Sequence, residues 1–132
     1  MEAVTILLAD DEAMLLLDYE SALTDAGFLV TAVSSGAKAI AILTSGGSIV
    51  DGVVTDIRFF HPPDGWQVAH VAREIDPNMP IVYISGHAAL EWASNGVPDS
   101  IMLEKPFTPA QLITAISQLL NARPPRAPQA DA

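Results

Sequence analysis

The sequence predicts a single α/β domain, built on a parallel sheet with helices on both of its faces. Short apolar runs alternate with segments whose apolar residues recur at helical spacing, and this alternation occurs five times along the chain. The 132 residues are enough for one hydrophobic core, and 50% of them are hydrophobic. Most of the apolar runs end in a polar residue, which places the candidate chemistry at one edge of the sheet.

The first strand is expected at Val4–Ala9, an apolar run that stops at Asp10-Asp11-Glu12. The following segment has a helical period, and Gly27 is placed as its C-terminal stop. The inward residues of this helix are predicted to be Leu16, Tyr19, Leu23 and Ala26. A second strand, Leu29–Val33, precedes a short helix that Ser34–Gly36 can cap. That helix is expected to bury Ala37, Ile40 and Ala41 and to end in the Ser45–Ser48 break.

The third strand, Gly52–Asp56, is short and rich in β-branched residues, which suits a buried parallel strand. A loop follows it, and Asp64 is a candidate N-cap for a helix that Pro77 and Pro80 end. The apolar face of this helix is predicted to be Val68, Val71, Ala72 and Ile75. The fourth strand is expected at Ile81–Ile84.

The last part of the chain is expected to form a weakly specified helix at Ala88–Ser94 and a fifth strand at Ser100–Leu103. Thr108 as N-cap and Pro109 at the first helical position begin the final helix. Its inward residues are predicted to be Leu112, Ile116 and Leu119. The domain is therefore placed at 1–120. Residues 121–132, rich in Pro and Ala, are expected to form a disordered tail.

Polar side chains follow four of the five predicted strands, and in a parallel sheet they share one rim. These residues are Asp10, Asp11, Asp56, Ser85 and Lys105. In the strand order 2-1-3-4-5 the three aspartates surround one crevice. Carboxylates about 5 Å apart repel by roughly 3 kcal/mol per pair at an effective dielectric near 20, so this cluster requires a cation. Oxygen ligands that leave room for phosphate favour Mg²⁺.

A phosphoryl group in transit to a carboxylate suits this arrangement. Asp56 is the candidate nucleophile because it is the lone carboxylate on the central strand, whereas Asp10 and Asp11 form a pair suited to holding a metal. Lys105 supplies a positive charge for a phosphoryl oxygen, and Ser85 offers a hydroxyl donor to another.

The ordered set of motifs over residues 4–120 resembles the receiver domain of two-component response regulators. The motifs are Asp10-Asp11, Asp56-Ile-Arg with a downstream Asp64-Gly65, Ser85-Gly86 and Lys105-Pro106-Phe107. The resemblance implies a flavodoxin-like (βα)5 fold. It also implies phosphoryl transfer from a sensor histidine kinase or phosphotransfer protein to Asp56. We expect a switch that catalyses only its own phosphorylation and dephosphorylation, and not an enzyme acting on other substrates. The Met1 start and the proline-rich tail favour an independent chain, although a fragment of a hybrid kinase would look similar.

The resemblance further implies roles for individual residues around Asp56. Mg²⁺ would be bound by Asp11, Asp56 and the backbone carbonyl of Arg58, with Asp10 acting mostly through water. Arg58 and His87 occupy positions that in the family tune the lifetime of the phosphoryl group. Ser85 would move toward that group, and the bond between Lys105 and Pro106 would be cis.

Two features depart from the family pattern. Phe59–Pro63 replaces the usual Met-Pro with a loop one residue longer. Met102 stands three residues before the lysine, where an aromatic ring often swings inward, and a flexible Met would have to repack instead. In the family the output surface is formed by the fourth helix, fifth strand and fifth helix, and it would bind a downstream partner or form a homodimer. Trp92 is either core packing or part of this surface.

Composition and charge limit the remaining classes of function. The formal net charge of -10 argues against direct binding of nucleic acid. Neither a signal peptide nor a membrane-spanning apolar segment is recognisable, and there is no cysteine, so the cytoplasm is the default location.

Two alternative functions remain open. A small phosphatase would use the same aspartyl phosphate chemistry. However, enzymes of the haloacid dehalogenase type carry Asp-x-Asp after the first strand, which Asp10-Asp11-Glu12 does not match. A receiver-like docking module that is never phosphorylated would keep the fold for interaction alone.

Overall fold

The computed structural model describes residues 3–47, 49–87 and 89–124, and these form the predicted α/β fold. Five parallel strands make one sheet in the order β2-β1-β3-β4-β5. The strands are β1 (Thr5–Ala9), β2 (Leu29–Val33), β3 (Gly52–Asp56), β4 (Ile81–Ser85) and β5 (Ile101–Glu104). Ala9 is paired with Thr55, so the carboxyl ends of β1 and β3 open side by side on one rim.

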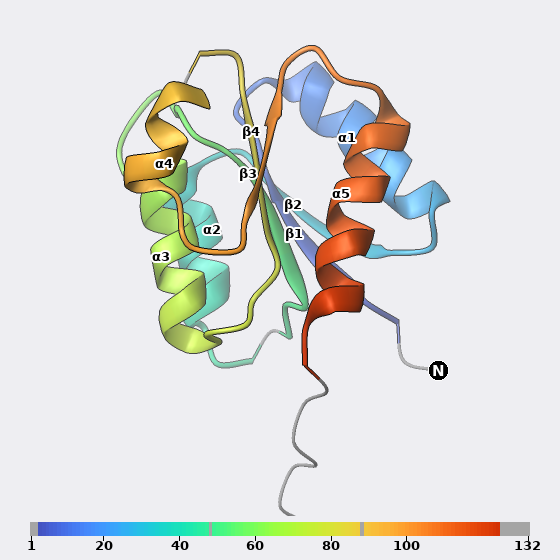
Figure 1. Cartoon of the computed structure of the whole chain (residues 1–132), viewed down its shortest axis with the longest axis horizontal. Coiled ribbons are helices and arrows are strands. Elements are labelled where there is room, and N and C mark those ends of the chain that lie inside the picture. Colours follow the sequence, from blue (N-terminus) through green and yellow to red (C-terminus); the bar gives the residue numbers. More distant parts are fainter. Residues whose placement is uncertain (1–2, 48, 88, 125–132) are drawn as a thin grey trace, which may run out of the picture.

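Helices cover both faces of this sheet. They are α1 (Ala13–Asp25), α2 (Gly36–Thr44), α3 (Gly65–Ile75), the 3-10 turn η1 (Ala89–Glu91), α4 (Trp92–Asn95) and α5 (Pro109–Ala122). Figure 1 shows α1 and α5 on one face and α2, α3 and α4 on the other. Within the described residues, no helix has both the length and the apolar character needed to cross a bilayer.

The sheet is buried on both faces, and alternate residues of each strand enter different cores. On the side of α1 and α5 the buried cluster is Ile6, Leu8, Leu23, Val54, Val82, Ile84, Leu112, Ala115 and Ile116. On the other side, Leu7, Val53, Ile81 and Tyr83 of the strands pack against buried residues of α2 and α3. Burial on both faces holds the strand ends, and therefore the polar rim, in fixed positions.

The predicted helix boundaries rest on local hydrogen bonds that the structure contains. Ser35 is the N-cap of α2, and its side chain accepts a hydrogen bond from the Lys38 amide. Asp64 and Thr108 begin α3 and α5 with reciprocal capping boxes, which satisfy amides that a helix start leaves unpaired. Gly27 follows α1 with a φ of 100°, a conformation that favours glycine.

The predicted inward faces of the helices are partly wrong. In α2, Ala37 and Ala41 are exposed, while Ala39 and Leu43 are buried. Many residues of this helix are apolar, so the sequence left several faces equally suitable, and packing against α3 selected one of them. Ala26 is also exposed, because α1 ends at Asp25 and leaves it outside the helix.

In α3 the side chain of Ile75 is exposed, contrary to the prediction, and Trp66 takes the buried place at the start of the helix. The Trp66 ring meets the Tyr83 ring edge to face, with centroids 4.7 Å apart. Val68 and Ala72 are buried as predicted.

The weakly specified helix at 88–94 is split into η1 and the single turn of α4. Trp92 fills the space beside Gly96, where any Cβ would collide with the indole ring, and the turn ends there. Ala88 of the predicted helix, and Ser48 of the predicted break after α2, lie outside the described residues.

The last helix runs to Ala122, two residues into the predicted tail. Arg123 then donates hydrogen bonds to Asp76 Oδ2 (2.6 Å) and to the Asp51 carbonyl (3.3 Å). This half-buried arginine ties the end of α5 to the end of α3 and to the segment before β3. Residues 125–132 of the predicted tail lie outside the described residues.

Gly65→Ala should destabilise the fold and displace Asp56. A Cβ at Gly65 would collide with the carbonyl oxygen of Asp56 and with Ile57 Cα, which are rigid backbone atoms. We expect the free energy of unfolding to fall by about 1–3 kcal/mol, measured by urea denaturation.

The matched control is Gly47→Ala, because a Cβ there meets open space. It should change the free energy of unfolding by less than about 0.5 kcal/mol. Equal effects of the two substitutions would contradict the steric argument.

Candidate functional site

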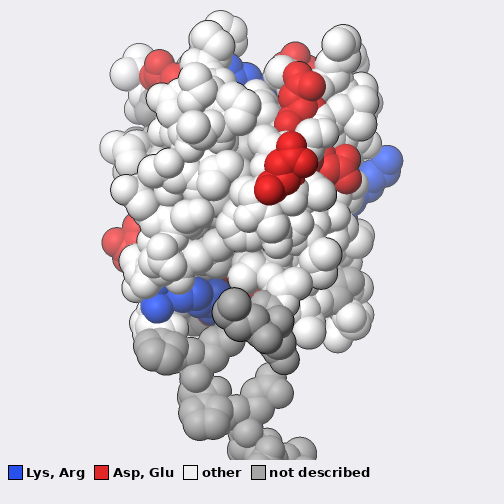
Figure 2. Space-filling view, turned by 90° about the vertical axis from the view of Figure 1, so that its right-hand side faces the viewer, with Lys and Arg blue, Asp and Glu red and all other residues white. Residues whose placement is uncertain are grey.

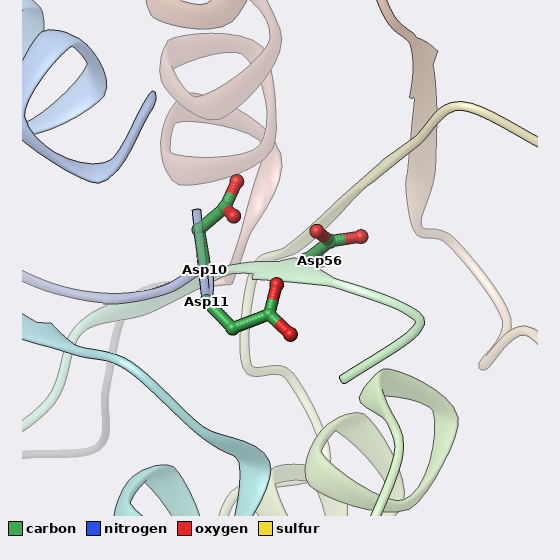
Figure 3. A group of neighbouring side chains, drawn as sticks. All are labelled: Asp10, Asp11 and Asp56. Carbon is green, nitrogen blue, oxygen red and sulfur yellow. The ribbon is translucent and has the colours of Figure 1, made fainter. Parts of the chain in front are cut away.

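Three carboxylates meet at the carboxyl ends of β1 and β3. Asp10, Asp11 and Asp56 each offer an oxygen atom, and these oxygens lie within 4.8 Å of one another (Figure 3). Asp10 is fully buried and Asp56 is 6% exposed, whereas Asp11 is more accessible to solvent. The predicted crevice between the two strands therefore exists. Because its carboxylates are largely shielded from water, their mutual repulsion is only weakly screened.

Lys105 brings the compensating positive charge. Its Nζ lies 3.1 Å from Asp56 Oδ2, 3.3 Å from Asp10 Oδ2 and 3.5 Å from Glu12 Oε1. The lysine follows β5, and its amide donates to the Ser85 carbonyl (2.8 Å), which continues the ladder between β4 and β5. The bond between Lys105 and Pro106 is cis, as the family resemblance implied.

The protonation of Asp10 and Lys105 reflects this crowding. Burial raises the pKa of Asp10 from 3.8 to about 6, and a hydrogen bond from the Glu12 amide opposes that rise. Burial by itself would lower the pKa of Lys105, but the charges of Asp56 and Asp10 outweigh it and hold the pKa above its usual value. The ammonium therefore remains charged at every physiological pH.

Backbone amides fix the orientation of each carboxylate. The Glu12 amide donates to Asp10 Oδ1 (2.9 Å) and the Ile57 amide to Asp56 Oδ1 (2.7 Å). The Phe60 amide donates to Asp11 Oδ2 (3.0 Å) across 49 residues of sequence. Sequence reasoning missed this role of Phe60, and the extra residue in the loop was the only signal that pointed there.

The lengthened loop between β3 and α3 rests on the start of α2. A Cβ at Gly36 would collide with the Pro63 carbonyl, so the two segments are in close contact. Phe59 packs against the core on the same side of the sheet, whereas the Phe60 side chain is 91% exposed. The loop thus turns the Phe59 ring toward the core and leaves the Phe60 ring exposed, edge to face with the His61 ring.

The cluster opens into a pocket of about 180 Å³. Its lining residues are Asp11, Glu12, Asp56, Arg58, Ser85, Gly86, His87 and Lys105. Ser85 is 3% exposed, and its Oγ accepts a hydrogen bond from the His87 amide (3.1 Å). The structure thus brings most of the sequence-predicted site residues to one pocket, with Asp10 beneath it.

Met102 and Trp92 lie outside this pocket. Met102 of β5 is paired with Tyr83 of β4, and it packs half-buried against the core on the side of α2 and α3. The Trp92 side chain is 38% exposed, and its indole Nε1 donates to Ser100 Oγ (2.9 Å). One edge of the Trp92 ring is thus held by a hydrogen bond, and the rest is partly exposed to solvent. The neighbouring Leu90 is 96% exposed.

The molecular surface carries its charge unevenly. Figure 2 looks onto the face of α1 and α5, where acidic side chains gather in the upper half and Lys and Arg stand at the edges. Helix α1 contains the acidic residues Asp18, Glu20 and Asp25. Such a surface repels a phosphate backbone, in keeping with the net charge of -10.

The strand order and the position of the acidic rim define the class of this protein, a flavodoxin-like α/β domain with an acidic site at the carboxyl ends of its strands. Residues 6–117 match the family model of the response regulator receiver domain. The chain therefore belongs to this family, whose members are the signal-transduction modules of two-component systems.

Curated relatives and a solved structure agree with this assignment. The chain is 35% identical to the response regulator receiver protein CpdR of Brucella abortus over 89% of this chain and 97% of CpdR. It is 31% identical to the sensor kinase CckA of the same organism, covering 90% of this chain but only 13% of CckA. A crystal structure of a response regulator receiver protein from Sinorhizobium medicae is 85% identical with a TM-score of 0.91, covering 93% of this chain and 98% of the other.

Asp10→Asn should stabilise the metal-free protein at neutral pH. The folded state holds the Asp10 proton more tightly than the unfolded chain, so its favourable contribution is complete below pH 3.8 and is lost as the pH rises through about 6. We expect Asp10→Asn to raise the free energy of unfolding at pH 8 by about 1–3 kcal/mol. Urea denaturation from pH 4 to 8 with EDTA measures this.

The control is Asp18→Asn, at an exposed position of α1. The pH dependence of its free energy of unfolding should follow that of the wild type. A rise in the free energy of unfolding between pH 4 and 6, by the same amount in the wild type and in Asp10→Asn, would contradict the burial argument.

Proposed function

We propose that this chain accepts a phosphoryl group on Asp56 from a sensor histidine kinase or a phosphotransfer protein, and that this modification changes its binding to a partner. The observation that carries the proposal is the contact of Lys105 Nζ with Asp56 Oδ2 (3.1 Å) beside the acidic cluster. A lysine and a nearly buried carboxylate in one small pocket are the groups that aspartyl phosphate formation needs.

The transfer follows from the groups in the pocket. A carboxylate oxygen of Asp56 attacks the phosphorus of a phosphohistidine, and the bond between phosphorus and nitrogen breaks. The other ring nitrogen of the phosphohistidine carries a proton, so the electron pair that goes to the released imidazole nitrogen leaves a neutral histidine on the donor. Lys105 holds a positive charge beside the oxygens of the group in transit, and the Ser85 hydroxyl lies on the same pocket wall. A carboxylate nucleophile is already ionised, so no general base is required.

The residues present fit a divalent cation. Asp11, Asp56 and the Arg58 carbonyl would hold Mg²⁺, with Asp10 acting through water, and oxygen-only ligands of this number suit that ion. When bound, Mg²⁺ supplies positive charge that offsets the repulsion among the carboxylates and the incoming phosphoryl oxygens. Arg58 and His87 line the mouth of the pocket, where they control access of water and so the lifetime of the phosphoryl group.

A groove beside the pocket supports docking of the phosphodonor domain. This groove of about 830 Å³ is lined by Leu15, Asp18, Tyr19, Ser21, Ala22, Asp25, Gly86, His87, Lys105, Pro106, Phe107 and Pro109. Two of these lining residues, Tyr19 and Phe107, stack with ring centroids 5.1 Å apart. His87 and Lys105 line both the pocket and the groove, so the two adjoin. A phosphodonor domain that reaches Asp56 therefore covers the apolar groove as well.

The output is proposed to lie on the face of α4, β5 and α5. Leu90 and the open edge of Trp92 give this face an apolar patch, and Met102 lies beneath it on β5. Phosphorylation of Asp56 would alter Ser85 at the end of β4 and, through it, this face. Its occupant would be a downstream protein, or a second copy of the chain as a homodimer.

Incubation with Mg²⁺ and acetyl phosphate should add one phosphoryl group to the protein, because acetyl phosphate is a small donor that enters the pocket unaided. Intact mass spectrometry measures the gain. Asp56→Asn should abolish it, and Asp18→Asn, on exposed α1, should leave it unchanged. An unchanged mass with acetyl phosphate, and again with a cognate kinase, would overturn the proposal.

Leu15→Glu should slow phosphoryl transfer from a cognate kinase by at least about ten-fold, because it places a charge in the apolar groove. Labelling by acetyl phosphate should not change, since a small donor does not use the groove. The matched control is Leu29→Glu, at an exposed position on β2, which should have no effect on either reaction. Equal loss with both donors would instead indicate damage to the pocket.

A further inference from the structure

An ion pair joins a residue of the phosphorylation pocket to η1. Arg58, two residues after Asp56, directs one guanidinium nitrogen to Glu91 Oε1 (3.1 Å) and Oε2 (3.0 Å). Glu91 belongs to η1, and the two residues are 33 positions apart in the sequence. Arg58 also lines the pocket itself. The same residue therefore lines the site of chemistry and contacts the segment that leads into α4.

The ion pair is weak enough to be exchanged. The side chains of Arg58 and Glu91 are 65% and 45% exposed, and ion pairs at such exposed positions contribute little because water screens them. Lys105, by contrast, is 15% exposed and shares its charge among Asp10, Glu12 and Asp56. Of the two permanent cations on the pocket wall, Arg58 is the one that is free to change partner.

A phosphoryl group brings a stronger acceptor for Arg58. It carries a charge of about −1.5 to −2 and three acceptor oxygens, and guanidinium groups bind phosphate in a fork geometry that a single carboxylate only partly matches. The pocket also contains the acidic Asp11 and Glu12, which repel an incoming anion. Among the residues that line the pocket, Arg58 is the permanent cation whose charge is not already divided among buried carboxylates.

We propose that Arg58 is a shared ligand, paired with Glu91 before phosphorylation and with the phosphoryl oxygens afterwards, and that the exchange releases η1 and α4. This inference rests on the proposed function, and it adds Glu91 as a positioning residue that acts through Arg58.

The segment released is held by few contacts, so the exchange has a mechanical consequence. Among the described residues, α4 is a single turn, and three hydrogen bonds join it and the residues just after it to the rest of the domain. The Trp92 indole donates to Ser100 Oγ, the His70 ring bonds to the Asn95 carbonyl, and the Val97 amide donates to the Tyr83 hydroxyl. Glu91 directly precedes Trp92, so loss of the ion pair frees the start of this turn. Signalling by this route does not need an aromatic ring at Met102.

The test uses beryllofluoride with Mg²⁺, a stable mimic of the phosphoryl group, on the wild type and on Glu91→Gln. Removal of the competing carboxylate should let Arg58 engage the anion more readily, so Glu91→Gln should bind beryllofluoride about two- to five-fold more tightly. The NMR signal of the Trp92 indole N–H in free Glu91→Gln should lie part of the way toward its position in the beryllofluoride-bound wild type.

A double-mutant cycle separates this exchange from simple repulsion by Glu91. Arg58→Ala should weaken beryllofluoride binding, and Glu91→Gln added to Arg58→Ala should then have no further effect. Glu74→Gln, at an exposed position on α3, is the matched control and should behave as the wild type.

An equal gain from Glu91→Gln in the presence and absence of Arg58 would overturn the inference, as would identical binding by Glu91→Gln and wild type. In both cases Asp56 would still become phosphorylated, so the proposed function would stand. Failure of the wild type to bind beryllofluoride, together with failure to be phosphorylated, would overturn both.

Discussion

The structure depends on the contact between one lysine ammonium and the buried carboxylates at the ends of β1 and β3. Asp10 is fully buried and Asp56 nearly so, and neither charge would be tolerated there without Lys105 at 3.3 Å and 3.1 Å. Compensation is incomplete, because burial still raises the pKa of Asp10 to about 6. The fold therefore holds excess negative charge at one rim, and a bound cation would relieve this repulsion.

The parallel sheet makes such a site possible. Both of its faces are covered, so β1, β3 and β4 are buried over almost all their length and cannot shift relative to one another. Amides at the strand ends then orient the carboxylates one by one. The loop after β3 adds a third donor, the Phe60 amide, which bonds to Asp11. The rigid strands thus fix where the carboxylates lie, and the backbone amides of the loops fix how they are oriented.

The opposite requirement applies to the segment after β4. A switch needs an element that is easily displaced, and the single turn of α4 with the weak, exposed ion pair of Arg58 and Glu91 has that character. Tyr83 and Met102, neighbours on β4 and β5, are packed into the core and leave little room for a swinging ring. This chain combines a rigid acidic site at the strand ends with a weakly held segment, η1 and α4, and the proposed signal passes from the first to the second.

The sequence by itself determined the features that depend on near neighbours in the chain. The five strands follow from short apolar runs rich in β-branched residues. The caps at Ser35, Asp64 and Thr108 and the glycine after α1 follow from hydrogen bonds and backbone preferences over a few residues. The acidic and basic residues at the strand ends were equally readable, because parallel strands bring their carboxyl ends to one rim. Only the tertiary structure decided the inward faces of α2 and α3, the division of the helix at 88–94, the bond from Phe60 to Asp11 and the pairing of Arg58 with Glu91. These depend on contacts between segments far apart in the chain, where many partners are chemically equivalent and only packing selects one.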